Sequence, residues 1–192
     1  MTYYDVLRTP AGWCGAVTSR GRVCRVVLGQ PDRASLRRSV LRQFPGCRPD
    51  AGACREAVLF LAAYFFEGAS ALAPARIDPG PATPFQLAVW NAAALIPFGR
   101  VRTYGWIAGR IGRPGAARAV GSALGANPLP LIIACHRVVC ANGGPGGFSA
   151  FGGVMLKRRL LKHEGIEFDE RGRVAGMESG ERWEEGMYDV HG

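Results

Sequence analysis

A proline-rich stretch divides this chain into two parts. Residues 73–84, APARIDPGPATP, contain four prolines and show no apolar periodicity. Because proline fixes φ and removes a backbone N–H, neither a helix nor a central strand can run through such a segment. The stretch is typical of a linker. We therefore expect one domain over residues 1–79, a second over residues 80–165 and a tail over residues 166–192.

The part before the linker predicts a small sheet with helices. Residues 3–29 contain three short runs rich in valine and aromatic residues, separated by the turn sequences TPAG and TSRG. Such runs are typical of strands. Residues 32–44 and 53–68 space their apolar residues as helices do, with Asp32 as a candidate N-cap of the first. The chain as a whole is therefore expected to be α/β (α+β).

The part after the linker reads as helical. Residues 83–99 begin with Thr83 as a candidate N-cap and Pro84 as a good first helical residue. Residues 103–112 and 116–127 then predict two short helices, joined by the three-residue turn RPG. This arrangement is a helix-turn-helix candidate, although any helical hairpin would look similar.

The charges along the chain favour a polyanionic partner. Residues 80–165 contain 10 Lys or Arg and a single acid, Glu164, whereas residues 166–192 contain 3 Arg and 8 acids. A segment with almost no negative charge suits nucleic acid. Codon bias could raise the arginine content, but it would not remove the acids. The tail mixes Glu, Gly and Arg and predicts an acidic, partly disordered segment.

Nothing in the sequence indicates export or a membrane span. No apolar run approaches the roughly 18–20 residues that cross a bilayer. The first ten residues, MTYYDVLRTP, lack a charged region followed by an apolar core. We therefore expect a cytoplasmic protein whose six cysteines are reduced thiols rather than disulfides.

The second helix of the predicted pair carries few long side chains. Arg118 is the only one in its first turns, among the small residues Ala116, Ala117, Ala119, Gly121, Ser122 and Ala123. A sequence-specific reader would offer several Arg, Asn or Gln side chains to base edges. A narrow helix can instead press against a duplex, or enter its minor groove, with little sequence preference. Close helix packing inside a core is the alternative.

Three chemistries compete for the pair Cys135 and His136. Zinc would need a second Cys or His pair at suitable spacing beyond Cys140, and only His163 lies near in sequence. A direct hydrolytic dyad is disfavoured, because neighbouring residues of an extended strand point to opposite faces. The third is a thiolate activated through a bound water by the imidazole, with Glu164 behind it to hold the tautomer.

The segment around this pair resembles a known family. NPLPLIIACHRVV, residues 127–139, is similar to the active-site signature of the O6-alkylguanine-DNA alkyltransferases, which usually reads NP.P..PCHRV. Neighbouring segments agree and follow the family's order: PFGRVRTYGWIA, ARAVGSALGANP, GGFSAFGG and KRRLLKHEG. The resemblance is strong over residues 80–165 and covers residues 1–79 only by general layout.

The resemblance implies a single-turnover DNA repair protein. Such proteins flip an alkylated guanine out of duplex DNA and move its O6-alkyl group irreversibly to their own cysteine, as methylated-DNA–[protein]-cysteine S-methyltransferases. O4-alkylthymine is a further candidate lesion. The implied partner is double-stranded DNA containing O6-alkylguanine, with no cofactor, no metal and a monomeric chain. The implied fold is a ribonuclease H-like N-terminal domain and a winged-helix-like C-terminal domain.

The resemblance also assigns site residues. Cys135 is the alkyl acceptor, His136 and Glu164 complete a water-bridged relay, and Asn127 braces the turn before the cysteine. At the DNA, Tyr104 lies beside the guanine N3 and a phosphate, and Arg118 fills the gap in the base stack. The other implied DNA contacts are Ala117, Ala119, Gly121 and Arg137, and the implied pocket residues are Leu124, Val138, Phe148, Ser149, Ala150 and Phe151.

Two positions depart from the family's pattern. Ala134 replaces the usual proline before the cysteine, which loosens the strand without touching the relay. The family's pocket tyrosine falls on Ala150, so that either Phe148 or Phe151 is expected to close the pocket through a shifted loop. The identity of that residue governs the range of alkyl groups accepted.

Two other functions fit parts of the sequence. A non-catalytic protein that binds alkyl lesions and flags them for other repair machinery would use the same helices, and an inert thiol would distinguish it. A transcriptional regulator would need a richer set of base-reading side chains than this helix offers.

Overall fold

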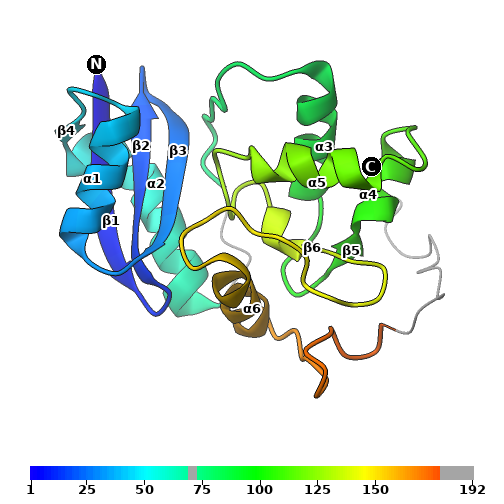
Figure 1. Cartoon of the computed structure of the whole chain (residues 1–192). Coiled ribbons are helices and arrows are strands. Elements are labelled where there is room, and N and C mark those ends of the chain that lie inside the picture. The colour runs from blue at the N-terminus through cyan, green and yellow to red at the C-terminus, as the bar shows by residue number, and fades with distance from the viewer. Residues whose placement is uncertain (69–72, 178–192) are drawn as a thin grey trace, which may run out of the picture.

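The computed structural model describes residues 1–68 and 73–177, and its N-terminal part is built on one sheet (Figure 1). The strands β1 (Thr2–Thr9), β2 (Gly12–Ser19) and β3 (Arg22–Gln30) pair antiparallel in chain order. The turn between β2 and β3 has positive φ at both Arg20 and Gly21, as a type I′ hairpin turn requires. The three predicted strands are thereby confirmed.

A fourth strand was not predicted. The two-residue strand β4 (Arg48–Pro49) pairs parallel with β1, so that the sheet order is β3-β2-β1-β4. Two residues give no detectable alternation, and proline is acceptable here because β4 is an edge strand.

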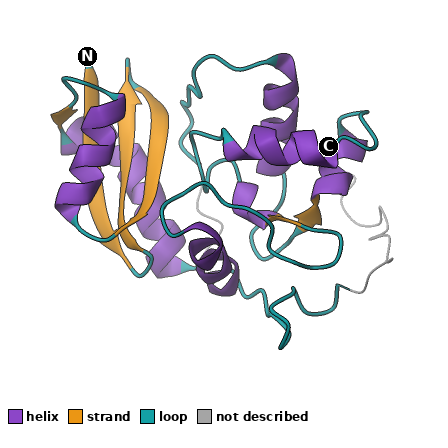
Figure 2. Ribbon diagram, viewed as in Figure 1, coloured by secondary structure: helices purple, strands orange, loops and turns teal. Residues whose placement is uncertain are grey.

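Two helices cover opposite faces of the sheet (Figure 2). Asp32 caps α1 (Arg33–Gln43), as predicted, by accepting a hydrogen bond from the Ser35 amide at 2.6 Å. This helix packs its buried side chains against one face of the sheet in a small cluster. The other helix, α2 (Ala51–Ala62), packs against the opposite face, which belongs to the main core.

The second predicted helix changes geometry before it ends. After α2 the chain continues as the π-helix η1 (Ala63–Glu67) and stops at Gly68, whose φ is 63°. Gly68 thus ends the helical segment as predicted, in the left-handed conformation that favours glycine. Wide π turns are rare and are frequently found at functional sites. Within this one, Tyr64 and Phe65 are buried, whereas Phe66 is 60% exposed.

The C-terminal part is mainly helical (Figure 1). It contains α3 (Pro84–Ala94), α4 (Tyr104–Arg110), α5 (Ala117–Gly125) and α6 (Gly153–His163). Thr83 and Gln86 form a capping box at the start of α3, which confirms the predicted N-cap. The predicted helical pair is present as α4 and α5, but residues 111–116 connect them, because both helices are shorter than expected. No helix of the described residues is long and apolar enough to cross a membrane.

The proline-rich segment lies along the edge of the sheet. The Val23 amide donates to the Arg76 carbonyl at 2.9 Å, and the Asp78 amide donates to the Val23 carbonyl at 2.9 Å. Farther along β3, the Val26 amide donates to the Pro128 carbonyl at 2.9 Å. The exposed edge of β3 is therefore covered by the linker and by the turn that leads to Cys135.

One hydrophobic core crosses both parts of the chain. It contains Cys14, Leu28 and Tyr64 from the N-terminal part together with Trp90 and Ile107 from the helical part. A hydrogen bond from the Arg159 guanidinium on α6 to the Pro10 carbonyl adds a polar tie between the parts. The segment after the linker is thus packed directly against the sheet domain.

The first half of the predicted tail is ordered. Within residues 166–177, Phe168 and Val174 form an antiparallel bridge, and Val174 is buried in a cluster with Leu161 of α6. These residues are therefore structured, whereas the expectation of partial disorder applied to the tail 166–192 as a whole. Residues 178–192 lie outside the described part of the chain.

Candidate active site

Cys135 begins a single 3-10 turn rather than lying in a strand. The turn η2 (Cys135–Arg137) leads into β6 (Val138–Val139), which pairs parallel with β5 (Arg102–Thr103). The predicted strand through Cys135 is therefore wrong, because the chain adopts extended geometry only from residue 138 onward. The structure gives no hydrogen bond between the His136 ring and the Cys135 thiol, so a direct dyad is absent within the described residues.

Asn127 holds the turn that precedes the cysteine. Its Nδ2 donates to the Ile133 carbonyl at 3.0 Å and to the Cys135 Sγ at 3.1 Å, and its Oδ1 accepts from the Leu129 amide at 2.8 Å. Within this turn Leu131 has a φ of 74°, a conformation that costs a leucine about 1–3 kcal/mol. The three bonds of Asn127 offset this strain and fix the position of the sulfur.

His136 and Glu164 lie in contact behind the turn. The imidazole Nε2 is 2.6 Å from the Glu164 Oε1, and both side chains are fully buried. The other ring nitrogen, Nδ1, is buried without a partner among the described residues. Since an ionised carboxylate only accepts, Nε2 carries the proton and Nδ1 has a free lone pair. An imidazole in this tautomer can accept a proton at Nδ1.

Arg137 is bound inside the protein instead of facing DNA. Its Nε and Nη2 donate to the two oxygens of Glu164 at 2.8 and 2.9 Å, and its Nη1 donates to the Ile96 carbonyl at 2.7 Å. The residue is 9% exposed. The predicted DNA contact of Arg137 is therefore corrected: two of the three bonded nitrogens form a buried ion pair with Glu164, and the third binds a backbone carbonyl.

The surroundings set the protonation states of the relay. Burial raises the pKa of Glu164, but the hydrogen bond from His136 and the ion pair with Arg137 outweigh it and lower the pKa to about 2. Burial lowers the pKa of His136, against the opposing effect of Glu164. At neutral pH the carboxylate is thus ionised and the imidazole is neutral, as a general base must be.

The Cys135 thiol is protonated at rest. Burial raises its pKa, and the hydrogen bond from Asn127 and the charge of Lys157 oppose this only in part. Lys157 is itself fully buried, and its Nζ donates to the Val138 carbonyl at 2.6 Å. Burial lowers the pKa of Lys157 to about 8, against the opposing effect of Cys135. The cysteine therefore needs a base to become a nucleophile.

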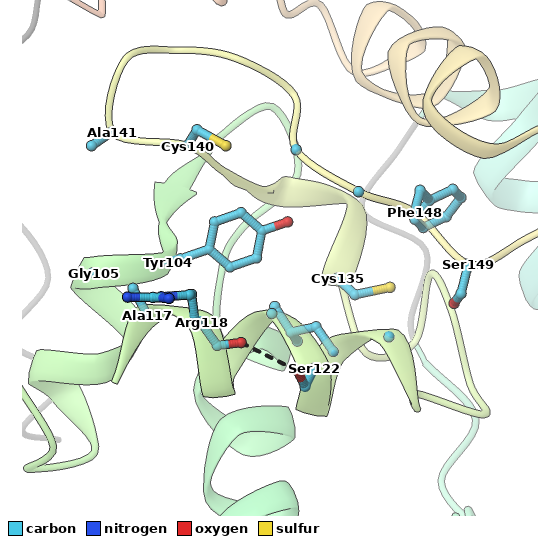
Figure 3. A pocket seen from close by; sticks show the side chains of 15 residues that line it. Tyr104, Gly105, Ala117, Arg118, Ser122, Cys135, Cys140, Ala141, Phe148 and Ser149 are labelled. Carbon is cyan, nitrogen blue, oxygen red and sulfur yellow. Dashed lines mark hydrogen bonds between the residues drawn. The ribbon is translucent and has the colours of Figure 1, made fainter. Parts of the chain in front are cut away.

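Cys135 lies at a cavity of about 830 Å³ between α4, α5 and the loop of residues 140–149, which is within the usual size of ligand sites. Figure 3 shows Cys135 between Tyr104 on one side and Phe148 and Ser149 on the other. The predicted residues that line the cavity are Tyr104, Ala117, Arg118, Gly121, Leu124, Cys135, Phe148 and Ser149.

Besides Arg137, four predicted DNA-contact or pocket residues do not line the cavity: Ala119, Val138, Ala150 and Phe151. Ala119 is exposed on α5, and Val138 is completely buried. Phe151 is 55% exposed and lies outside the cavity, so that Phe148 rather than Phe151 contributes to the cavity wall. Ala150 packs against the core instead.

Several lining residues were not predicted: Gly105, Ser122, Gly125, Cys140, Ala141, Gly146 and Gly147. Most are small residues whose role depends on what packs beside them, which the sequence does not give. Gly146 is the clearest case, because its φ is 69° and a Cβ would lie 2.7 Å from the Tyr104 hydroxyl. Only glycine fits at this position opposite Tyr104.

Arg118 lies at the mouth of the cavity. It is exposed in the first turn of α5, while Val120, Ala123 and Leu124 pack the opposite side of the helix into the core. The described residues offer it no acidic partner. The helix α5 is thus packed into the core on one face and exposed on the other.

The helical part of the chain matches a known family model. Residues 84–166 match the model described as 6-O-methylguanine DNA methyltransferase, DNA binding domain. The methylated-DNA–protein-cysteine methyltransferase of Salmonella typhimurium is 54% identical over 83 residues, which are 43% of this chain and 47% of that protein. The chain thus spans about half the length of that relative.

A mycobacterial relative matches over a longer span. The methylated-DNA–protein-cysteine methyltransferase of Mycobacterium tuberculosis is 47% identical over 116 residues, which are 60% of this chain and 68% of that protein. The crystal structure of O6-methylguanine methyltransferase from the same organism has a TM-score of 0.69 and 37% identity, covering 85% of this chain and 93% of that one. A structure of the mycobacterial OGT in complex with DNA has a TM-score of 0.68, 36% identity and the same coverage.

Proposed function

Because the chain belongs to the family of methylated-DNA–protein-cysteine methyltransferases, we propose that it reverses O6-alkylguanine damage by moving the alkyl group from DNA to its own Cys135. The observation that carries this proposal is the position of the Cys135 thiol between a cavity and a buried acid–base pair. Cys135 faces a cavity large enough for a base, and an ionised carboxylate and a neutral imidazole lie buried behind it.

The proposed reaction begins with the loss of the thiol proton. His136 accepts it at Nδ1 through a bridging water, and Glu164 stabilises the imidazolium that forms. The Cys135 sulfur then attacks the alkyl carbon, so that the S–C bond forms while the C–O6 bond breaks. The electron pair of the broken bond stays on guanine, which takes up one proton and thereby balances the proton lost by the thiol.

Tyr104 is the proposed donor beside the flipped base. It lines the cavity, and burial together with the nearby thiols of Cys140 and Cys135 raises its pKa to about 12. The hydroxyl is therefore protonated at neutral pH and can donate to the guanine N3 or to a phosphate. The product is a thioether, which is a poor leaving group, and the protein would act once per molecule.

The proposed partner is double-stranded DNA. The basic segment 80–165 and the free face of α5 support binding along the duplex, where α4 and α5 would serve as the helix-turn-helix of a winged-helix-like domain. Base flipping costs a few kcal/mol, and Arg118 would offset part of this by filling the gap. The chain would act as a monomer, since every proposed site residue comes from one copy.

We propose a ribonuclease H-like domain over residues 1–79, the DNA-binding and alkyl-accepting domain over residues 80–165 and a tail over residues 166–192. A cytoplasmic location is supported by the six cysteines, all of which are free thiols.

Arg118→Ala is expected to separate base flipping from chemistry. The substitution removes the side chain that fills the gap, so repair of O6-methylguanine in duplex DNA should slow by about 10- to 100-fold, as the loss of roughly 1–3 kcal/mol would give. Reaction with free O6-benzylguanine should be nearly unchanged. Rates measured on both substrates, with Arg113→Ala as the control in the adjacent connection, would test this. Equal losses on both substrates would remove Arg118 from the flipping step.

The direct test of the proposed function is an intact-mass measurement. The protein is mixed with a duplex carrying O6-methylguanine, and a single gain of one CH₂ unit is expected on Cys135. Tight, lesion-selective binding without such a gain would favour the non-catalytic lesion-binding protein. Absence of both would overturn the family-based proposal for this chain.

A further inference from the structure

A tyrosine from the N-terminal part reaches into the proposed relay. Tyr64 lies in the π-helix η1 and is 2% exposed. Its hydroxyl donates to the Glu164 Oε1 at 2.8 Å, across 100 residues of sequence. The same Oε1 is the atom that accepts the Nε2 proton of His136. The sheet domain therefore touches the carboxylate that orients the imidazole.

The Glu164 carboxylate is saturated with donors. Oε1 accepts from His136, Tyr64 and the Arg137 Nη2, and Oε2 accepts from the Arg137 Nε and, at 3.0 Å, from the Gly99 amide. Without Tyr64, Arg137 would draw the carboxylate toward itself, since its bidentate ion pair with Glu164 is stronger than the single hydrogen bond between Glu164 and His136. The Tyr64 hydroxyl bonds the oxygen that faces His136 and opposes this pull.

The π turn holds Tyr64 in place from several sides. His163 of α6 donates its Nε2 to the Tyr64 backbone carbonyl at 2.6 Å, and its ring packs 5.2 Å from the tyrosine ring. Phe65 and Phe98 pack edge-on against the same ring, with ring centroids 4.9 and 6.0 Å from that of Tyr64. A hydroxyl fixed this firmly is well suited to orienting a neighbouring group.

We propose that Tyr64 is a positioning residue for alkyl transfer: its hydroxyl keeps the Glu164 Oε1 bonded to the His136 Nε2–H, and so keeps the imidazole in the tautomer whose Nδ1 is free to accept a proton. This inference rests on the proposed function. It gives the N-terminal part a specific task in the reaction, beyond packing against the helical part. The titratable and charged groups that face Tyr64 are Glu164, His136, Arg137 and His163, and Lys157 lies near enough to act on His136.

Tyr64→Phe is the variant that tests the proposal, because it removes the hydroxyl and keeps the ring. We expect transfer from an O6-methylguanine duplex near neutral pH to slow by about 10- to 100-fold, a part of what a general base contributes. The defect should shrink as pH rises through the pKa of the Cys135 thiol, because the thiolate then forms without a positioned base. Lesion-binding affinity should not change.

Phe65→Leu is the matched control. It loosens the same π turn beside the same ring, but leaves every hydrogen bond to Glu164 in place. It should lower the melting temperature at least as much as Tyr64→Phe and leave the shape of the pH–rate profile unchanged. A purely structural role for Tyr64 would instead produce a defect of equal size at every pH, and that outcome would overturn the proposal.

A second readout keeps this inference separate from the function on which it rests. Labelling of Cys135 by iodoacetamide, followed by peptide mass mapping against the other five cysteines, reports thiolate formation without DNA. If the wild-type protein labels readily but forms no adduct with the lesion, the proposed function fails. If the wild-type protein transfers and Tyr64→Phe shows the wild-type pH profile in both assays, the role of Tyr64 fails.

Discussion

Replacing Cys135 with serine should abolish alkyl transfer while leaving lesion binding intact. A serine hydroxyl is far less acidic than a thiol, and a neutral imidazole is too weak a base to ionise it in this buried turn. Sulfur is also the better nucleophile toward an alkyl carbon. The expected loss is at least about 1,000-fold, which is roughly 4 kcal/mol of transition-state stabilisation. The assays are single-turnover transfer and binding to a lesion-containing duplex.

Cys140→Ser provides the control for this experiment. Cys140 lines the same cavity but makes no hydrogen bond with His136 or Asn127 in the described residues. Its replacement should leave transfer within about twofold of the wild-type rate, as expected for a change outside the relay. Transfer retained by Cys135→Ser, or lost in Cys140→Ser, would assign the acceptor role to the wrong thiol.

Replacing Glu164 with glutamine should lower both the unfolding free energy and the rate of alkyl transfer. The Arg137 guanidinium would lose its buried counter-charge, a change that typically costs about 3–5 kcal/mol of unfolding free energy. The imidazole would lose the negative charge that stabilises its protonated form, so transfer near neutral pH should fall by about 100-fold or more. Urea unfolding and single-turnover rates measure the two effects separately.

The stability difference between the wild-type protein and Glu164→Gln should depend on pH. The pKa of Glu164 is lowered from its usual value of about 4.5 to about 2, which corresponds to roughly 3 kcal/mol. Because the folded-state pKa is the lower one, this stabilisation is complete above about pH 4.5 and is lost as the pH falls toward 2. The two proteins should therefore converge in acid. Glu167→Gln, at an exposed position after α6, should show no such convergence.

The parts of the site that could be predicted from the sequence are those whose residues lie close together along the chain. Cys135, His136 and Asn127 lie within one signature of 13 residues, and the structure brings them together with Glu164, as predicted. Helix caps such as Asp32 and Thr83 are similarly local, because the side chain and the amides it binds are three residues apart.

The missed features all depend on contacts between distant segments. Lys157 and Arg137 belong to the basic segment, yet both are buried, since a sequence does not reveal which face of a helix or a turn points inward. Tyr64 reads as one more aromatic residue of an apolar helix, and its bond to Glu164 spans 100 residues. The π turn that positions it depends on tertiary packing and has no sequence periodicity of its own.

The hydrogen bonds that cover the edge of β3 link the state of Cys135 to the stability of the sheet. The bond from the Val26 amide to the Pro128 carbonyl attaches the turn before Cys135 directly to the sheet. If alkylated Cys135 crowds that turn, the displacement is passed to an edge strand, which then exposes unpaired amides and carbonyls. A molecule alkylated at Cys135 would therefore differ from an unreacted one in the sheet as well as at the sulfur, and should unfold more readily.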